Sequence, residues 1–545
     1  MAHADGSART RLNRGAVAAL AALLLLYVAA GVDGLDRLPI VHGDEMWNAA
    51  PAWTLATQGV YGSDLFAGFY RAEQRTYQFM PVLQLLLAAD FALFGIGLLQ
   101  IRMLSIVVGA IVLLLTYVIG RQVGGIRVGL LAAWILGVHR LASGSLDTGI
   151  VLVDLVRQTR YHIVASALGL AALCVFLWAR SDRADVSLPP SRRALWPFAL
   201  CGALAGLAFL SHIYGAFWLP ALAVVLVAGH GLDNSRRSLS ALCLGFALAI
   251  VPWGLYVAGD LAAYMGQMRM YGERFALTDA WFYVDNVLRE PRRYFPFGHR
   301  EIAAIGPGTW MALIAFPLTM LRAVAVARRQ RASALSAVVI ALLVISGLFA
   351  VLLKWKTFSY LLTTLPLAAV VMADGAWALV GRLPPRMARV VVAVALLISA
   401  GEAAGALSSR RARAARTTPY DIVMRQIASH VPEDAVVVAP HRYWLGLRER
   451  RVRSWLVPLL MTESSSYHAP MPLDAALELI DPDVLVLDDL EFGGYFRGLA
   501  DPKDPRHWQY QQLQRFLASR EVHLVAEIRD ESYGRIVIYG LDATP

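Results

Sequence analysis

The 545-residue chain is 57% hydrophobic and 17% charged, and its mean hydropathy is +0.53. Soluble domains contain about 45–50% apolar and about 25% charged residues, so a single water-soluble globule is excluded. Disorder, a collagen-like repeat and a disulfide framework are excluded too, because apolar residues dominate, glycine has no three-residue period and only three cysteines occur. The composition predicts a polytopic membrane protein.

Apolar runs close to the length that spans a bilayer, about 20 residues, follow one another along the first 407 residues. We expect about eleven transmembrane helices, over 15–32, 101–120, 127–143, 161–179, 195–211, 213–229, 239–258, 303–321, 333–352, 358–380 and 390–407. The run 80–99 is apolar as well, but counting it as a span would invert every later loop. We therefore expect this run to form a helix that lies in the outer interface.

The charge distribution predicts the orientation of this bundle. Residues 1–407 carry 33 basic and 21 acidic side chains and residues 408–545 carry 17 and 19, so the net charge of +10 belongs to the membrane part and does not indicate nucleic acid. With the amino terminus inside, arginines occupy every alternate short loop, as the positive-inside rule requires. The loops 33–100, 144–160 and 259–302 and the tail from 408 are then extracytoplasmic, at a plasma membrane such as a bacterial inner membrane.

The tail differs in character from the rest of the chain. Four short runs rich in β-branched residues, 435–439, 484–487, 523–528 and 535–539, indicate strands, and 420–430, 473–480 and 507–520 indicate helices. We expect a small extracytoplasmic α/β domain over 408–545, after a membrane domain over 1–407. It has no glycine-rich phosphate loop and no cluster of metal ligands, which favours a supporting or acceptor-binding role over a second catalytic site.

The first outer loop begins with His42-Gly43-Asp44-Glu45, and a short helix is expected over 49–57. The ordinary explanation of Asp44 is that it caps this helix. The alternative is that the two carboxylates carry chemistry at the membrane surface.

An ordered set of short motifs favours the second explanation. After Asp44-Glu45 come Tyr77-x-x-x-Pro81, Phe94-Gly95, Arg102-x-x-Ser105 and Gly120-Arg121. This order resembles the polyprenyl-phosphate-sugar glycosyltransferases of the GT-C fold, in particular the protein O-mannosyltransferase and lipid A aminoarabinose transferase group, over residues 15–380. The resemblance implies a polyprenyl-phosphate sugar as donor, a lipid, glycan or protein as acceptor, and an extracytoplasmic reaction in which Asp44 matches the family's loop carboxylate.

The chemistry of such a transfer requires few groups. An acceptor hydroxyl benefits from a general base, for which we expect Asp44 with Glu45 beside it, and a leaving polyprenyl phosphate needs cations more than an acid. A single displacement would invert the sugar carbon. The candidates for donor-phosphate binding are Lys356, Lys354, Arg160, Arg75 and Tyr360, with Arg71 and Arg157 as further cations. Each of these cations could instead extend to lipid headgroups.

Two departures from the family pattern leave alternatives open. Met80 stands where the aminoarabinose transferases place a lysine before the proline. The family's second carboxylate is matched by Asp154 or Asp147, or is replaced by His162, which could also be a polar residue at the end of a span.

The loop 259–302 is rich in aromatic and charged residues and occupies the place of the family's lid-like loop. We expect its Arg292, Arg293 and Tyr294, with His162, on the acceptor side of the site. An interfacial aromatic belt is the alternative.

Three other functions compete with this hypothesis. A transporter or a lipid-linked-glycan flippase would show internal repeats or ionisable residues within its spans, and neither is prominent. A lipid-diphosphate polymerase fits the early Asp-Glu loop less well, and a membrane scaffold would leave that pair without a role. The sequence shows no metal-ligand cluster, so we expect no metal and no other cofactor.

Overall fold

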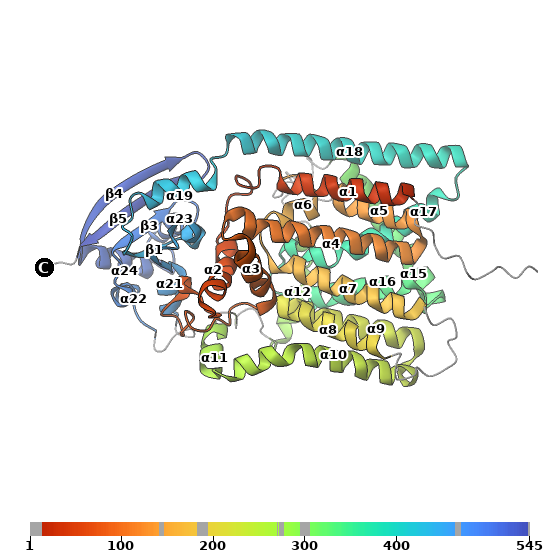
Figure 1. Ribbon diagram of the computed structural model, residues 1–545, viewed down its shortest axis with the longest axis horizontal. Coiled ribbons are helices and arrows are strands. Elements are labelled where there is room, and N and C mark those ends of the chain that lie inside the picture. The colour runs from red at the N-terminus through yellow and green to blue at the C-terminus, as the bar shows by residue number, and fades with distance from the viewer. Residues whose placement is uncertain are drawn as a thin grey trace, which may run out of the picture.

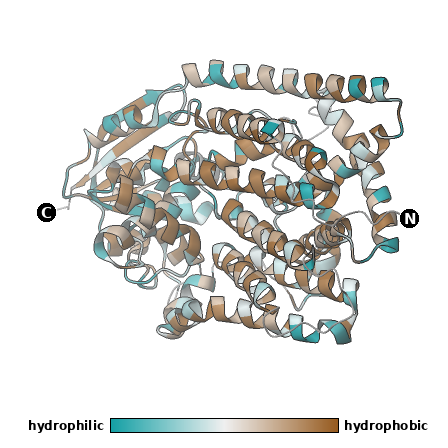
Figure 2. Ribbon diagram, turned by 45° about the vertical axis from the view of Figure 1, so that its right-hand side comes forward, coloured by the Kyte–Doolittle hydropathy of each residue, from teal (hydrophilic) through white to brown (hydrophobic). Residues whose placement is uncertain are grey.

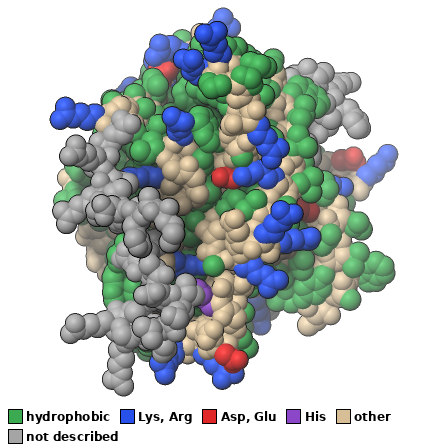
Figure 3. Space-filling view, turned by 90° about the vertical axis from the view of Figure 1, so that its right-hand side faces the viewer, with side chains coloured by type: hydrophobic (Ala, Val, Ile, Leu, Met, Phe, Trp, Pro, Cys, Tyr) green, Lys and Arg blue, Asp and Glu red, His purple; other side chains and the backbone are tan. Residues whose placement is uncertain are grey.

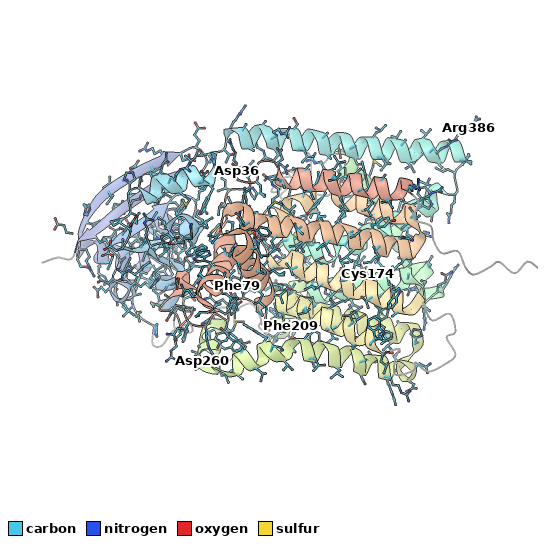
Figure 4. The ribbon with its side chains drawn as sticks, viewed as in Figure 1. Asp36, Phe79, Cys174, Phe209, Asp260 and Arg386 are labelled. Atoms are coloured by element: carbon cyan, nitrogen blue, oxygen red, sulfur yellow. The ribbon has the colours of Figure 1, made fainter. Side chains whose placement is uncertain are left out.

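The computed structural model describes residues 14–140, 147–181, 195–269, 271, 277–294, 306–463 and 470–542. A bundle of long helices and a smaller α/β domain lie end to end (Figure 1). We call the end of the bundle that meets this C-terminal domain the domain end, and the opposite end the far end. Figure 4 places Asp36, Phe79 and Asp260 toward the domain end and Arg386 at the far end.

Eight helical segments of the described chain are long and apolar enough to cross a membrane. They are α1 (Arg14–Val32), α4 (Leu98–Gly124), α7 (Tyr161–Ser181), η3 with α9 (Ile213–Phe217 and Trp218–His230), α10 (Leu232–Ala258), α15 (Pro307–Arg329), α16 (Ala334–Leu352) and α18 (Pro385–Arg416). Three shorter apolar helices, α5 (Ile126–Gly137), α8 (Trp196–Ser211) and α17 (Leu365–Val380), pack against them. These helices coincide with the apolar runs of the sequence, which confirms the expected polytopic bundle.

Glycines allow close contact between two of these helices. A Cβ at Gly202 of α8 would lie 1.9 Å from the Leu242 carbonyl oxygen, and one at Gly245 of α10 would lie 1.9 Å from that of Ala199. Small residues are typical of such close helix–helix contacts in membranes. Apolar residues dominate the bundle helices in Figure 2, and many of them, Leu248 and Leu255 of α10 among them, are exposed on its outside.

Two helices of the first loop lie at the domain end and run across the direction of the spans (Figure 1). They are α2 (Gly43–Gln58) and α3 (Pro81–Phe94), with the short η1 (Asp64–Phe66) between them. Proline at its first position begins α3 and Gly95, at φ +75°, ends it. The crossing direction of α3 agrees with the interfacial helix expected over 80–99. Other short helices that connect spans in the described chain are α6 (Val151–Val156), α11 (Leu261–Arg269), α12 (Ala280–Arg289), α13 (Pro291–Tyr294) and η5 (Phe358–Thr363).

The C-terminal domain contains a five-stranded sheet of order β2-β1-β3-β5-β4, in which β1, β2 and β3 are parallel and β5 and β4 are antiparallel neighbours. The strands are β1 (Val436–Ala439), β2 (Arg451–Ser454), β3 (Val484–Asp488), β4 (Glu521–Asp530) and β5 (Gly534–Asp542). The helices are α19 (Tyr420–Ala428), η6 (His441–Tyr443), α20 (Trp444–Leu447), α21 (Leu456–Met461), α22 (Leu473–Ile480), α23 (Phe492–Leu499) and α24 (His507–Ala518). The edge strand β2 was not expected, because its four residues include two arginines and carry little hydropathy signal. The boundary expected at 407/408 falls inside α18, which continues to Arg416.

Candidate functional site

Asp44 lies in the first turn of α2 with its carboxylate partly open. The helix begins at Gly43, and its cap is His42, whose Nδ1 accepts a hydrogen bond of 3.1 Å from the Asp44 backbone N–H. Asp44 is therefore not the N-cap that its residue type suggests. Its side chain is 37% exposed, and its Oδ2 lies 3.4 Å from Nη1 of Arg160. The carboxylate is held by a cation and still faces solvent.

Glu45, the next residue, is fully buried in a bidentate ion pair with Arg102 of α4. Arg102 Nη2 lies 2.9 Å from Glu45 Oε2, and Nε lies 3.2 and 3.1 Å from the two carboxylate oxygens. Arg102 also donates to the backbone oxygens of Leu35 and Pro39 at 2.6 and 2.8 Å. Burial raises the pKa of Glu45, and the Arg102 guanidinium opposes that shift. The pair ties α2 and the loop before it to a spanning helix.

Asp154 stabilises its own turn. Its carboxylate accepts hydrogen bonds from the Thr148 N–H at 2.9 Å, the Thr148 hydroxyl at 2.8 Å and the Gly149 N–H at 2.8 Å. Burial raises the pKa of Asp154 to about 6. Asp147 pairs with Arg413 of α18 at 3.2 Å. Among the described contacts, none joins either carboxylate to Asp44.

Arg157 caps the C-terminal end of α1. It is fully buried and donates hydrogen bonds of 2.6–3.3 Å to five backbone carbonyls, those of Ala30, Gly31, Asp33, Gly34 and Leu38. Helix C-termini carry unpaired carbonyls and partial negative charge, which a guanidinium satisfies. This arginine is thus a helix cap, and its contacts do not favour the phosphate-binding role considered from the sequence.

Two cations share one carboxylate where α13 meets the end of α16. Lys356 Nζ lies 2.9 Å from Glu290 Oε2, and Arg293 Nε lies 2.7 Å from Glu290 Oε1. The Arg293 guanidinium also stacks 5.6 Å from the ring centre of Tyr360 in η5. Burial lowers the pKa of Lys356, although Glu290 acts against this shift. Two cations on one carboxylate leave a local excess of positive charge.

A group of rings lies between these two charged regions. We call it the His162 cluster, and it comprises Tyr161, His162, His212 and Tyr360. The ring centre of His162 lies 4.3 Å from that of Tyr161, 4.8 Å from that of His212 and 4.8 Å from that of Tyr360. Arg160 precedes Tyr161 in the chain, and Arg293 covers Tyr360. Direct contacts and chain neighbours thus connect Asp44 through the cluster to Lys356.

Four other sequence candidates lie outside this series of contacts. The Arg75 guanidinium stacks 5.2 Å from the ring centre of Tyr256, beyond the site. Lys354 and Arg292 are exposed. Tyr294 ends α13, and its side chain lies outside the described part of the structure. No described contact joins these four to Asp44.

The C-terminal domain also reaches the first turn of α2, which the sequence did not indicate. A Cβ at Gly43 would lie 2.1 Å from Nε2 of His441 in η6, so glycine is required for this approach. Arg442, the next residue, pairs with Glu491 at 2.9 Å. No local pattern marks this contact, because its partners are about 400 residues apart in the chain.

Metal-binding residues do not gather in the described ranges. There, no group of three or more His, Cys, Asp or Glu side chains is placed to hold an ion.

Solved structures share this arrangement of bundle and domain. ArnT from Cupriavidus metallidurans bound to undecaprenyl phosphate matches with a TM-score of 0.61 at 15% identity, over 98% of this chain and 100% of that one. The archaeal oligosaccharyltransferase AglB from Archaeoglobus fulgidus, in complex with an inhibitory peptide and a dolichol-phosphate, matches with a TM-score of 0.56 at 14% identity, over 97% of this chain and 74% of that one. This chain has the GT-C fold.

The GT-C fold expected from the order of the motifs is therefore confirmed. ArnT in the apo state matches as well, with a TM-score of 0.58 at 14% identity over 96% of this chain and 98% of that one. No protein-family model and no curated protein sequence matches the chain. The likeness lies in the three-dimensional arrangement, and the helices that carry it identify an integral membrane protein.

Proposed function

We propose that this GT-C protein is an inverting glycosyltransferase that transfers a sugar from a polyprenyl-phosphate donor to a lipid, glycan or protein acceptor. One observation carries the proposal: the partly exposed Asp44 carboxylate stands at one end of a series of contacts whose other end is the Lys356–Arg293 pair. A base at one end and cations at the other are the two requirements of the reaction.

In the proposed reaction, Asp44 takes the proton of the acceptor hydroxyl as its oxygen bonds to the anomeric carbon. The bond from that carbon to the phosphate oxygen breaks, and polyprenyl phosphate leaves with the electron pair. Lys356 and Arg293, with Arg160 and Tyr360, bind the phosphate that leaves. Glu45 acts indirectly, since its bond to Arg102 positions the first turn of α2.

The orientation follows from the far end of the bundle. Arginine and lysine side chains gather on the face shown in Figure 3, where few acidic side chains are visible. The positive-inside rule assigns such an end to the cytoplasm. We therefore propose that the domain end, with Asp44 and the C-terminal domain, faces the extracytoplasmic side of an inner membrane.

The decisive experiment compares the wild type with Asp44→Asn, purified in detergent and supplied with radiolabelled undecaprenyl-phosphate sugars. Loss of the base is expected to lower kcat by about 10²–10⁴-fold without loss of folding, because the side chain is partly exposed. Asp36→Asn is the matched control, since Asp36 is an exposed carboxylate of the same loop. Full transfer by Asp44→Asn would refute the proposal, and we expect transfer to persist in EDTA.

Lys356→Met tests the other end of the site. Removal of this buried cation is expected to raise the KM for the donor about 10-fold or more, which corresponds to one lost charge-assisted hydrogen bond. Lys503→Met, which removes an exposed lysine of the C-terminal domain, should leave KM unchanged. An unchanged KM in Lys356→Met would exclude this lysine from phosphate binding.

A further inference from the structure

His162 is buried in the site without a described hydrogen-bond partner. It is 5% exposed, and neither Nδ1 nor Nε2 has a hydrogen-bond partner in the described chain. Buried polar groups nearly always have such a partner, because an unpaired donor or acceptor costs free energy. Both nitrogens of a single imidazole are unpaired here, at the centre of the series of contacts between Asp44 and Lys356.

The surroundings of His162 indicate what its nitrogens can bind. The described rings in contact with His162 are those of Tyr161, His212 and Tyr360. A neutral imidazole offers one donor and one acceptor. A hydroxyl group also has one donor and can accept, whereas a phosphate dianion only accepts hydrogen bonds. Cations for a phosphate lie to either side, at Arg160 and Arg293, so the imidazole itself is suited to a hydroxyl.

The rings beside His162 are of the kind that contacts a sugar. Tyr161 and His212 stack with ring centres 4.4 Å apart and planes 4° apart, and Phe79 lies 5.9 Å from Tyr161. Aromatic walls with a few placed polar groups are typical of small-molecule sites. The C–H face of a pyranose packs on an aromatic ring face, and the nitrogens of His162, which have no partner among the described residues, supply direction.

The position of the cluster agrees with the order of groups in a displacement. The transferred sugar must lie between the base and the leaving phosphate. The cluster lies between Arg160, which binds Asp44, and Arg293, which shares Glu290 with Lys356.

We infer that the His162 cluster is the subsite for the transferred sugar, and that the His162 imidazole hydrogen-bonds to one sugar hydroxyl. This inference rests on the proposed function and adds to it the residue that selects the sugar. A site built to hydrogen-bond a hydroxyl discriminates strongly against an analogue that lacks it.

The test uses the full-length protein in detergent with His162→Phe and His162→Gln. Phenylalanine keeps the ring volume and removes both nitrogens, while glutamine keeps a donor and an acceptor. The probes are undecaprenyl phosphate for binding, and undecaprenyl-phosphate hexoses together with their monodeoxy analogues for transfer.

For the preferred hexose we expect His162→Phe to lower kcat/KM about 10- to 100-fold, as for one or two hydrogen bonds lost from a buried site. His162→Gln should recover part of the loss. The Kd for undecaprenyl phosphate should stay within about twofold. One monodeoxy donor should be used equally well by the wild type and His162→Phe, because the hydroxyl that the imidazole would bind is already missing.

His139→Phe is the matched control. His139 is also a buried histidine, but its Nε2 already bonds to the Gly308 carbonyl at 2.7 Å and no described contact joins it to the cluster. We expect this variant to lose thermal stability and to keep its ranking of donor sugars.

Three results would overturn the inference. Equal kcat/KM for the wild type and both His162 variants would show that His162 only packs in the fold or binds water. An equal loss with every deoxy donor, accompanied by weaker binding of undecaprenyl phosphate, would indicate general damage to the site. A wild type that binds undecaprenyl phosphate but prefers no sugar would also refute it, whereas a wild type that neither binds nor transfers would refute the proposed function itself.

Discussion

Three arginines at each end of the bundle have opposite surroundings. At the far end, Arg328, Arg329 and Arg382 are exposed, and water or lipid headgroups can surround them. At the domain end, Arg102, Arg157 and Arg293 are fully buried, and carboxylates or rows of backbone carbonyls surround them.

This difference separates charges that orient a membrane protein from charges that build a site. An exposed arginine needs no partner, whereas a buried one is costly without carboxylates or carbonyls around it. Arg102 pairs with Glu45, the neighbour of Asp44. Arg293 covers a ring of the His162 cluster, whereas Arg157 caps α1. The surroundings of an arginine, more than the number of arginines, therefore distinguish the two ends.

Breaking a buried pair should give the largest effect. Arg102→Ala leaves Glu45 buried without its partner, and we expect the free energy of unfolding to fall by about 3–5 kcal/mol. Titration with SDS, followed by circular dichroism, measures this change. A loss below about 1 kcal/mol would mean that water enters the site and that the contrast between the two ends is weaker than described.

Asp154 should give a smaller effect that depends on pH. Its pKa rises from 3.8 to about 6 on folding, so the folded state favours the protonated form. This contribution to stability is complete below about pH 4 and is lost as pH rises through about 6, a change of about 3 kcal/mol. Asp154→Asn can keep the bonds to Thr148 and Gly149 without a charge. Its stability relative to the wild type should therefore rise between pH 4 and 7, and parallel stability curves would contradict this.

The smallest effect is expected at the far end. Arg328→Gln removes an exposed charge and should change the free energy of unfolding by no more than about 0.5 kcal/mol. Transfer activity in detergent should match that of the wild type. A large loss in either measurement would show that the far end contributes to the folded core, and the comparison would have to be revised.

The spans and the small domain could be predicted because hydropathy and β-branched runs are local signals. The Asp44-Glu45 motif is a local signal too. The different roles of its two carboxylates could not be predicted, because the partner of Glu45 is Arg102 on a different helix. Arg160 and Lys356 could be named from the order of motifs. The stack of Tyr161 on His212 and the approach of His441 to Gly43 depend on packing between distant segments, for which one sequence offers no pattern.

The contact between Gly43 and His441 also has a consequence for biosynthesis. About 400 residues separate the two positions, and a ribosome adds about 5–20 residues per second. The first turn of α2 is therefore made about 20–80 s before the imidazole that covers it. A nascent or prematurely terminated chain can insert its spans and still lack the completed surface beside Asp44, so only a fully translated molecule carries the whole site.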